Sequence, residues 1–393
     1  MQETIPRYPA HPFTGDPLPV PKDPVTRVRL PSGDPVWLVT GYDEVKRALS
    51  HPLLSRDVTT GDPQVGSAGP IGGYRPGRRT LQMDGAAHTQ LRKLAARPFT
   101  PRRVSGIRDR VQELTDGLLD RLEALGPGAD LVGNLTYPLP MTVITELFGV
   151  PAEDRDRFAR WATTIVTVVG VSADELDAAR AELQGYLGAL VRERRAHPGD
   201  DVLSGWLTAE EGGDRLSDIE IVQMAQTIII GGYETTVGLI AGGVLRLLQH
   251  PGQLAALRAD PALMRTAVEE ILRFQPVGIF FLILMARGDL ELGGVRIREG
   301  EGVMPLPYHG NRDTARFTDP DRFDIHREPA GHIAFGHGPH ACLGAALARI
   351  EVEVVLARLL RRFPGLRLAV DPSELRWHQD RLTNGIVSLP VAW

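Results

Sequence analysis

The chain is poor in cysteine and in lysine. Cys342 is the only cysteine among 393 residues, which excludes an internal disulfide framework. Lysine occurs at three positions among the 44 basic residues, and the net charge is −5. A weakly acidic balance of this kind does not favour non-specific binding of nucleic acid.

Signals for export and for membrane insertion are also missing from the sequence. Residues 1–24 are polar and rich in proline, without the basic and apolar regions of a signal peptide. The most apolar segment, residues 221–248, is interrupted by Gln223, Gln226, Glu234 and Arg246. We therefore expect a cytoplasmic protein that does not bind membranes.

Helical periodicity dominates the rest of the chain. It predicts helices over residues 42–50, 88–97, 102–125, 137–148, 154–169, 173–196, 269–274 and 343–363. A capping box at Ser217 and Glu220 opens a further helix that can run to His250. Short strands are expected at 26–30, 36–40, 279–285, 290–292 and 303–306. With no alternation of strands and helices, this pattern predicts a mainly α fold.

A glycine-punctuated loop, residues 335–344, holds the single cysteine and runs directly into an apolar helical pattern. Backbone N–H groups and the dipole at a helix N-terminus would favour Cys342 as a thiolate. Gly338 and Gly344 carry no side chain, so a flat cofactor could approach the backbone closely. His340 could donate a hydrogen bond to a carboxylate of that cofactor. Taken by itself, a lone cysteine is more often a small buried apolar residue.

The sequence Gly-Gly-Tyr-Glu-Thr-Thr, residues 231–236, stands in the middle of the long apolar helix. Two glycines there cost about 1 kcal/mol each relative to alanine, and a buried acid adds to the cost. The Thr235 hydroxyl could bond back to the Gly231 carbonyl and bend the helix. The bend would leave room for dioxygen beside two groups that supply protons, the acid Glu234 and the alcohol Thr235. The alternative is a kinked structural helix with a surface-facing acid.

Two further pairs of residues stand about one helical turn apart. Glu270 and Arg273 share one helix face, and as an ordinary surface ion pair they would contribute little to stability. His88 and Arg92 could clamp the carboxylates of a cofactor, or they could lie on a solvated helix face.

In chain order, these motifs resemble those of the cytochrome P-450 superfamily, the haem-thiolate monooxygenases. The cysteine loop matches at six positions, namely Phe335, Gly338, Cys342, Gly344, Leu347 and Ala348. The resemblance extends from about residue 37 to the C-terminus. It implies a single cytochrome P-450 domain over residues 1–393, with a large helical region, a small β-rich lobe and the proline-rich segment 1–35 packed on it.

The resemblance also implies a role for each motif. Cys342 would be the axial thiolate ligand of haem b iron. Glu234 and Thr235 would organise proton delivery beside Gly231. Three basic residues would bind the haem propionates, namely His88, Arg92 and His340. A buried structural group that braces the cysteine loop would comprise Glu270, Arg273 and Arg322.

The chain departs from the family pattern at two positions. Gly231 stands where alanine is commoner. Leu284 stands where the family commonly has another propionate-binding arginine, and Arg287, at an odd offset along the strand, would face the opposite side. We therefore expect a haem edge that is less firmly held, where Leu284→Arg would be tolerated and would tighten haem retention.

The implied activity is oxidation of an apolar or aromatic small molecule with O₂ and two electrons, in secondary-metabolite biosynthesis. Candidate pocket segments are the Gly/Pro-rich loop from residue 61 to Leu81, residues 161–169 with Trp161, Ile230, residues 277–282 with Val277, Phe280 and Phe281, and Ile386. The sequence has no NAD or flavin fingerprint, so electrons would come from a ferredoxin and a ferredoxin reductase. A docking surface for them could include Lys93, Arg97, Arg102, Arg103 and Arg349.

Two other functions stay open at this point. One is oxidative C–C or C–N coupling on the same fold without oxygen insertion. The other is a non-catalytic haem-binding protein, against which the intact Glu234–Thr235 pair argues.

Overall fold

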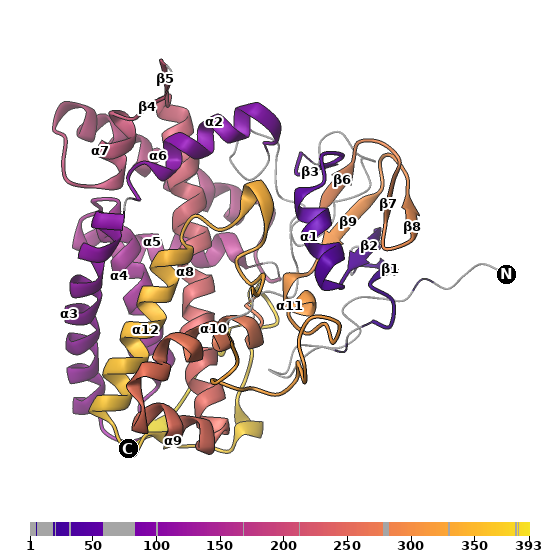
Figure 1. Ribbon diagram of the computed structural model, residues 1–393. Coiled ribbons are helices and arrows are strands. Elements are labelled where there is room, and N and C mark those ends of the chain that lie inside the picture. Colours follow the sequence, from indigo (N-terminus) through magenta and orange to yellow (C-terminus); the bar gives the residue numbers. More distant parts are fainter. Residues whose placement is uncertain are drawn as a thin grey trace.

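The computed structural model describes residues 5, 19, 21–30, 33–57, 83–99, 101–167, 169–211, 213–277, 283–328, 331–381, 383 and 385–393, with the backbone alone at 101–105 and 211. Several expectations lie outside the described part, namely those for loop 61–81, most of segment 1–35, Phe280, Phe281 and the side chains of Arg102 and Arg103. In the remainder, the predicted mainly α fold with a small β-rich lobe is confirmed (Figure 1).

The helices agree with the periodicity of the sequence, and most differ from it only at their ends. They are α1 (Tyr42–Ser50), α2 (Gly85–Ala96), α3 (Pro101–Leu125), α4 (Pro138–Leu147), α5 (Arg155–Val166), α6 (Ala173–Ala196), α7 (Val202–Leu207), α8 (Asp218–Gln249), α9 (Pro251–Ala259), α10 (Met264–Phe274), α11 (Pro307–Gly310) and α12 (Ala345–Arg362). Helix α5 ends three residues earlier than expected because Thr167 is extended and bridges to Arg381.

Helix α8 begins at the predicted capping box. The Glu220 amide donates to the Ser217 hydroxyl at 3.3 Å, and the Ser217 amide donates to the Glu220 carboxylate at 2.9 Å. In the described part of the chain, only α8 is long and apolar enough to cross a membrane, and 72% of its most apolar window is buried inside the protein. Figure 1 shows α8 running through the centre of the helical region. Helix α8 is therefore the core helix around which the other helices pack.

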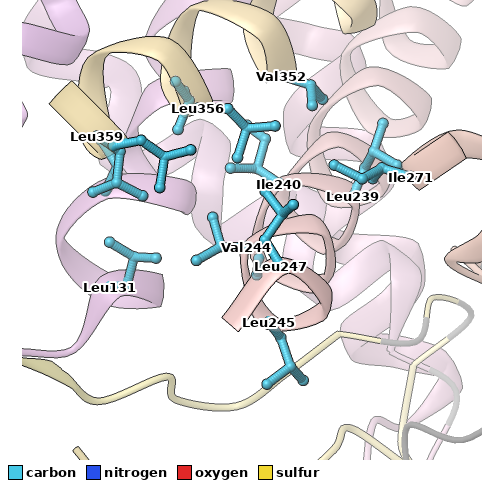
Figure 2. Close-up of a cluster of buried hydrophobic side chains, with 14 of the residues drawn as sticks. Leu131, Leu239, Ile240, Val244, Leu245, Leu247, Ile271, Val352, Leu356 and Leu359 are labelled. Carbon is cyan, nitrogen blue, oxygen red and sulfur yellow. The ribbon is translucent and has the colours of Figure 1, made fainter. Parts of the chain in front are cut away.

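The largest hydrophobic cluster joins α8 to α12, α10 and α3. Side chains from α8 and α12 point toward one another there, among them Leu239, Ile240, Val244, Val352, Leu356 and Leu359 (Figure 2). Burying a leucine or isoleucine in this way contributes roughly 1.5–3 kcal/mol each. This packing holds α12, whose N-terminus follows the cysteine loop, against α8.

Three arginine–carboxylate contacts also join α3 to α12. Arg108 donates to both carboxylate oxygens of Glu353, at 3.0 and 2.9 Å. Arg358 pairs with Asp116 at 2.6 Å. Arg362 pairs with both Asp120 and Glu123, at 2.7 and 2.9 Å. The contacts follow one another along the length of the two helices.

The β-rich lobe lies beside the helical region in Figure 1. Its five-stranded sheet has the order β1-β2-β9-β6-β3, formed by β1 (Val25–Arg29), β2 (Pro35–Val39), β9 (Gly302–Pro305), β6 (Leu284–Ala286) and β3 (Leu54–Ser55). The strands predicted at 26–30 and 36–40 are present as β1 and β2, which pair antiparallel as a hairpin. Smaller pairs are β7 (Leu290–Leu292) with β8 (Val295–Ile297), β4 (Glu210–Glu211) with β5 (Asp214–Arg215), and β10 (Arg367–Leu368) with β11 (Val391–Ala392).

Candidate functional site

The cysteine loop turns sharply before α12. The Cys342 amide donates to the Phe335 carbonyl at 2.9 Å, which closes the loop on itself. Gly336 and Gly338 have φ values of 74° and 73°, where a side chain would be strained. A Cβ at Gly338 would also stand 2.9 Å from the Leu49 carbonyl oxygen of α1. Glycine at 338 therefore allows the loop to lie directly against the β-rich lobe.

The Cys342 residue is exposed at the surface of the loop, whereas its sulfur is shielded from solvent. Burial of the sulfur raises the thiol pKa, while the Gly344 amide, Arg92 and Arg349 act in the opposite direction. The Gly344 amide therefore acts in the direction expected for a helix terminus, whereas desolvation of the sulfur opposes it. Leu343, the next residue, packs against a cluster that includes Tyr233 of α8.

Three of the predicted basic residues lie together beside this loop. The His88 and His340 rings are stacked, with centroids 3.8 Å apart, and Arg92 donates to the Ala341 carbonyl. Asp84, which precedes α2, accepts from His340 Nε2 at 3.3 Å. His88 is only 1% exposed, so the alternative of a solvated helix face is wrong for this residue.

His88 is buried without a partner for one of its nitrogens. Burial, with the charges of His340 and Arg92, lowers the His88 pKa to about 4. Among the residues that the structure describes, none gives its Nε2 atom a hydrogen-bond partner. A buried polar atom of this kind is unfavourable unless a further group satisfies it.

The structure corrects the expectation for Leu284. Leu284 is 3% exposed and packs in an apolar cluster with Val303, its partner on β9. An arginine there would have to bury its charge, so the predicted tolerance of Leu284→Arg is contradicted by the packing. Arg287 is exposed and pairs with Asp57 at 3.3 Å.

The middle of α8 has the predicted hydroxyl contacts. Thr235 donates to the Gly231 carbonyl at 2.6 Å, as expected, and Thr236 makes the same contact with Gly232 at 2.7 Å. The helix nevertheless continues to Gln249 without a break. A Cβ at Gly231 would meet no atom of the described residues within 4 Å, so this turn of α8 borders open space in the described part of the chain.

Glu234 points inward and is 3% exposed. Arg381 donates to its Oε1 at 2.9 Å, and the Thr383 hydroxyl donates to Oε2 at 3.4 Å. Burial raises the Glu234 pKa, although Arg381 and Thr383 lower it in part. The alternative of a surface-facing acid is therefore wrong, and Glu234 is a buried acid held by the C-terminal segment.

The expected structural group beneath the loop is present with one change of residue. Arg273 contacts both Glu270 oxygens at 2.7 and 2.8 Å, and both side chains are buried. The third member of the group is Arg327, whose Nε lies 3.3 Å from Glu270. Arg322 instead gives its backbone carbonyl to Arg273, while its side chain turns outward to Asp324.

Arg349 is not a free surface cation. It donates to both oxygens of Glu269 at 2.6 and 3.0 Å and lies over the Phe335 ring at 4.7 Å. It therefore braces the cysteine loop from α12. Of the other expected docking residues, Lys93 and Arg97 are exposed.

The proposed pocket residues fall into two groups. Trp161 and Ile386 belong to hydrophobic clusters and are buried, so they pack as core residues. Ile230 and Val277 are partly buried.

Sequence reasoning missed four residues that the fold brings to the site. They are Arg56, Asp84, Arg327 and Arg381. Only Asp84 carried a local signal, as a residue that stands directly before a helix. The other three arginines reach the site through contacts between distant segments.

These residues suit a flat, anionic cofactor that binds through sulfur. At Gly344, an added Cβ would approach only the Cys342 sulfur, at 4.0 Å. The guanidinium of Arg92 contacts this loop through the Ala341 carbonyl. His88, whose buried Nε2 has no partner among the described residues, stacks on His340 of the same loop. This arrangement fits haem. The thiolate would ligate the iron, the glycines would let the ring approach, and the basic groups would face its carboxylates.

Comparison with known proteins agrees with haem as the cofactor. The family model described as Cytochrome P450 matches residues 22–390. Nocardicin C N-oxygenase of Nocardia uniformis subsp. tsuyamanensis is 46% identical, covering 95% of this chain and 93% of that protein. The cytochrome P450 monooxygenase PikC of Streptomyces venezuelae is 42% identical, covering 97% and 92%. The crystal structure of the LnmA cytochrome P450 hydroxylase, from the leinamycin biosynthetic pathway of Streptomyces atroolivaceus S-140, has a TM-score of 0.88 and 40% identity, covering 99% and 100%.

The chain therefore belongs to the cytochrome P450 family, whose members bind haem iron through a cysteine thiolate. Within that family it is a monooxygenase of the kind found in secondary-metabolite biosynthesis. Such enzymes act on small molecules with O₂ and redox partners.

Proposed function

We propose that Cys342 is the axial ligand of haem b iron and that Phe335, Gly338 and Gly344 shape its loop. The supporting observation is that the only cysteine lies in a loop that contacts a basic cluster, since Arg92 donates to the Ala341 carbonyl and the His340 ring stacks on buried His88. Haem bound there would supply the iron chemistry that activates O₂. The protein's part is to ligate the iron, to neutralise the propionates through His88, Arg92 and His340, and to move protons.

We propose that Glu234 and Thr235 handle those protons. The Thr235 hydroxyl is oriented by the Gly231 carbonyl at 2.6 Å, so its oxygen can accept from a water molecule while its proton stays on the helix. Burial of Glu234 raises its pKa, which suits a group that gives and takes protons near neutrality. Open space beside Gly231 would leave room for dioxygen.

The substrate is proposed to be an apolar or aromatic small molecule, oxidised as a tailoring step of a secondary metabolite. Support comes from the relatives, one named for N-oxygenation of nocardicin C and one from the leinamycin biosynthetic pathway. We propose a ferredoxin and its reductase as electron donors, a cytoplasmic location and a single domain over the whole chain.

The test is a pair of measurements on purified protein. The reduced carbon monoxide complex should absorb at the wavelength diagnostic of thiolate ligation, and Cys342→His should lose that band while keeping bound haem. A histidine-type band in folded wild-type protein would contradict the assignment. Cys342→Ser serves as a second control, because it removes the thiolate without offering a nitrogen ligand.

Product mass then separates the possible reactions. A panel of apolar metabolites is incubated with a ferredoxin, its reductase and a nicotinamide reductant. Hydroxylation adds one oxygen atom, whereas oxidative coupling removes two hydrogens without adding oxygen. Failure to consume reductant with any substrate that shifts the haem spectrum would favour a non-catalytic haem protein.

A further inference from the structure

Helix α10 carries two consecutive acids that hold different partners. Glu270 belongs to the buried structural group with Arg273. Glu269 accepts from Arg349 Nε and Nη2 at 2.6 and 3.0 Å and contacts His332 Nε2 at 2.9 Å. Consecutive side chains on a helix with 3.6 residues per turn point about 100° apart. The two acids can therefore serve two separate groups from the same turn of α10.

The His332 ring donates to Glu269 in a defined tautomer. Its Nδ1 accepts from the Ala334 amide at 3.3 Å, so the ring proton that Glu269 accepts is on Nε2. Burial would raise the Glu269 pKa, but hydrogen bonds from His332 and Arg349 lower it to about 2. At neutral pH, Glu269 is therefore a carboxylate that accepts from both side chains at once.

Both partners of Glu269 also contact Phe335, the first residue of the cysteine loop. The Arg349 guanidinium lies over the Phe335 ring, 4.7 Å from its centroid, in a cation–π contact. The His332 ring centroid lies 6.2 Å from the same ring. The Phe335 carbonyl accepts from the Cys342 amide at 2.9 Å. A continuous chain of contacts therefore runs from Glu269 on α10 to the backbone of the cysteine.

The contact between Glu269 and Arg349 fixes the guanidinium in orientation as well as in position. Two guanidinium nitrogens meet the two carboxylate oxygens, and a forked pair of this kind defines the plane of the guanidinium. The Arg349 side chain is 38% exposed, so without the carboxylate it could turn into solvent. Glu269 therefore decides whether the cation stays over the Phe335 ring.

We propose that Glu269 is a positioning residue for the cysteine ligand. It holds the side chains of Arg349 and His332 against Phe335, and the Phe335 carbonyl in turn holds the Cys342 amide. The inference rests on the proposed haem-thiolate function, because the loop must hold the sulfur in a fixed place only if the sulfur ligates iron. Outer partners of a metal ligand orient it and tune the metal. Loss of Glu269 should therefore change the iron–sulfur bond, although Glu269 is not itself a ligand.

The test compares variants of the haem-loaded protein by three measurements. Resonance Raman spectra of the ferric protein give the iron–sulfur stretching frequency. The reduced carbon monoxide complex gives the rate at which the thiolate band is lost, and a redox titration gives the reduction potential. The variants are Glu269→Gln, Arg349→Gln and the double variant with both changes. Glu210→Gln/Arg215→Gln is the matched control, because it removes an exposed pair of the same residue types between β4 and β5.

The double variant separates position from charge, because it removes one negative and one positive group together. It should have a shifted iron–sulfur frequency and should lose the thiolate band at least about tenfold faster than wild type, the lower end of the effect of losing outer partners of a metal ligand. The single variants should share both effects. Reduction adds an electron, so the potential should rise in Glu269→Gln, which removes a negative charge, and fall in Arg349→Gln. The control should match wild type throughout.

A wild-type frequency and a wild-type loss rate in the double variant would overturn the proposal, even with opposite potential shifts in the single variants, because the pair would then act by charge alone. Equal effects in the control would also overturn it. If the double variant does not fold, Arg349→Lys decides, since lysine keeps the charge but cannot form the fork. A shifted frequency in Arg349→Lys would support the proposal, and wild-type behaviour would overturn it.

The wild-type carbon monoxide spectrum is recorded first. Absence of the thiolate band there would defeat the haem-thiolate function itself. A normal wild-type band, with an unaffected double variant, would defeat only the positioning role of Glu269.

Discussion

Replacing Arg381 by glutamine tests whether Glu234 is held as the structure describes. The substitution removes the cation that contacts Glu234 Oε1 at 2.9 Å and leaves a carboxyl group that is 3% exposed. Breaking a buried ion pair from one side typically costs about 3–5 kcal/mol. The Arg381 side chain keeps 15% exposure, so we expect the lower end of that range, about 3 kcal/mol.

This cost should depend on pH in a defined direction. Burial already raises the Glu234 pKa above 4.5, and Arg381 lowers it in part, so the pKa rises further in Arg381→Gln. A protonated Glu234 needs no cation, and the variant should therefore be close to wild type below pH 4.5. As pH rises, the unfolded chain releases this proton while the folded state retains it, so folding stability falls.

Thermal unfolding measured between pH 5 and pH 8 gives the result directly. For 393 residues, a loss of about 3 kcal/mol corresponds to a fall in Tm of about 4 °C. Glu234→Gln/Arg381→Gln should recover most of the loss, because both charges are gone. Arg376→Gln, an exposed arginine of the same segment, is the matched control. Strict additivity of the two single variants, with no pH dependence, would refute the pairing.

Three further substitutions test other parts of the site. Thr235→Ala should keep haem and substrate binding but release more hydrogen peroxide and less product per reductant consumed; unchanged product yield would place the proton relay elsewhere. Leu284→Arg should lower Tm, because it forces a guanidinium into an apolar cluster, and an unchanged Tm would mean that the side chain escapes it. Glu351 is 3% exposed, and no described residue is a partner for its Oε2. Burial raises its pKa to about 8, so folding stability should fall as pH rises from about 4.5 to 8, by at most about 5 kcal/mol. Glu351→Gln should flatten that dependence in a pH series of denaturant unfolding curves, and a slope like that of wild type would count against a neutral acid.

Local signals in the sequence predicted the elements well. Ser217 with Glu220 located the start of α8 because a capping box acts within four residues. Periodicity over 173–196 matched α6 at both ends for the same reason, since Ser172 caps it. The hydroxyl contact from Thr235 to Gly231 was also predictable, because it spans one helical turn.

Contacts between distant segments were not predictable in this way. Glu234 and Arg381 are 147 residues apart, and no pattern near either residue indicates the other. Arg322 and Arg327 stand in one irregular segment, where spacing does not tell which side chain turns inward. The position of Arg56 depends on the pairing of β3 with β6. Strand β3 has only two residues, so its sequence shows no alternation of apolar and polar residues from which the partner strand could be predicted.

The ion pairs between α3 and α12 have a consequence for the cysteine. Arg362, in the last of them, lies 17 residues beyond Ala345, the first residue of α12, which is about 25 Å along the helix at 1.5 Å per residue. A slide of α12 by one turn, about 5.4 Å, would break the contacts of Arg108, Arg358 and Arg362 together. These pairs therefore fix the position of α12 along α3. The position of the Cys342 sulfur relative to the helical region is then set partly by contacts at the far end of α12.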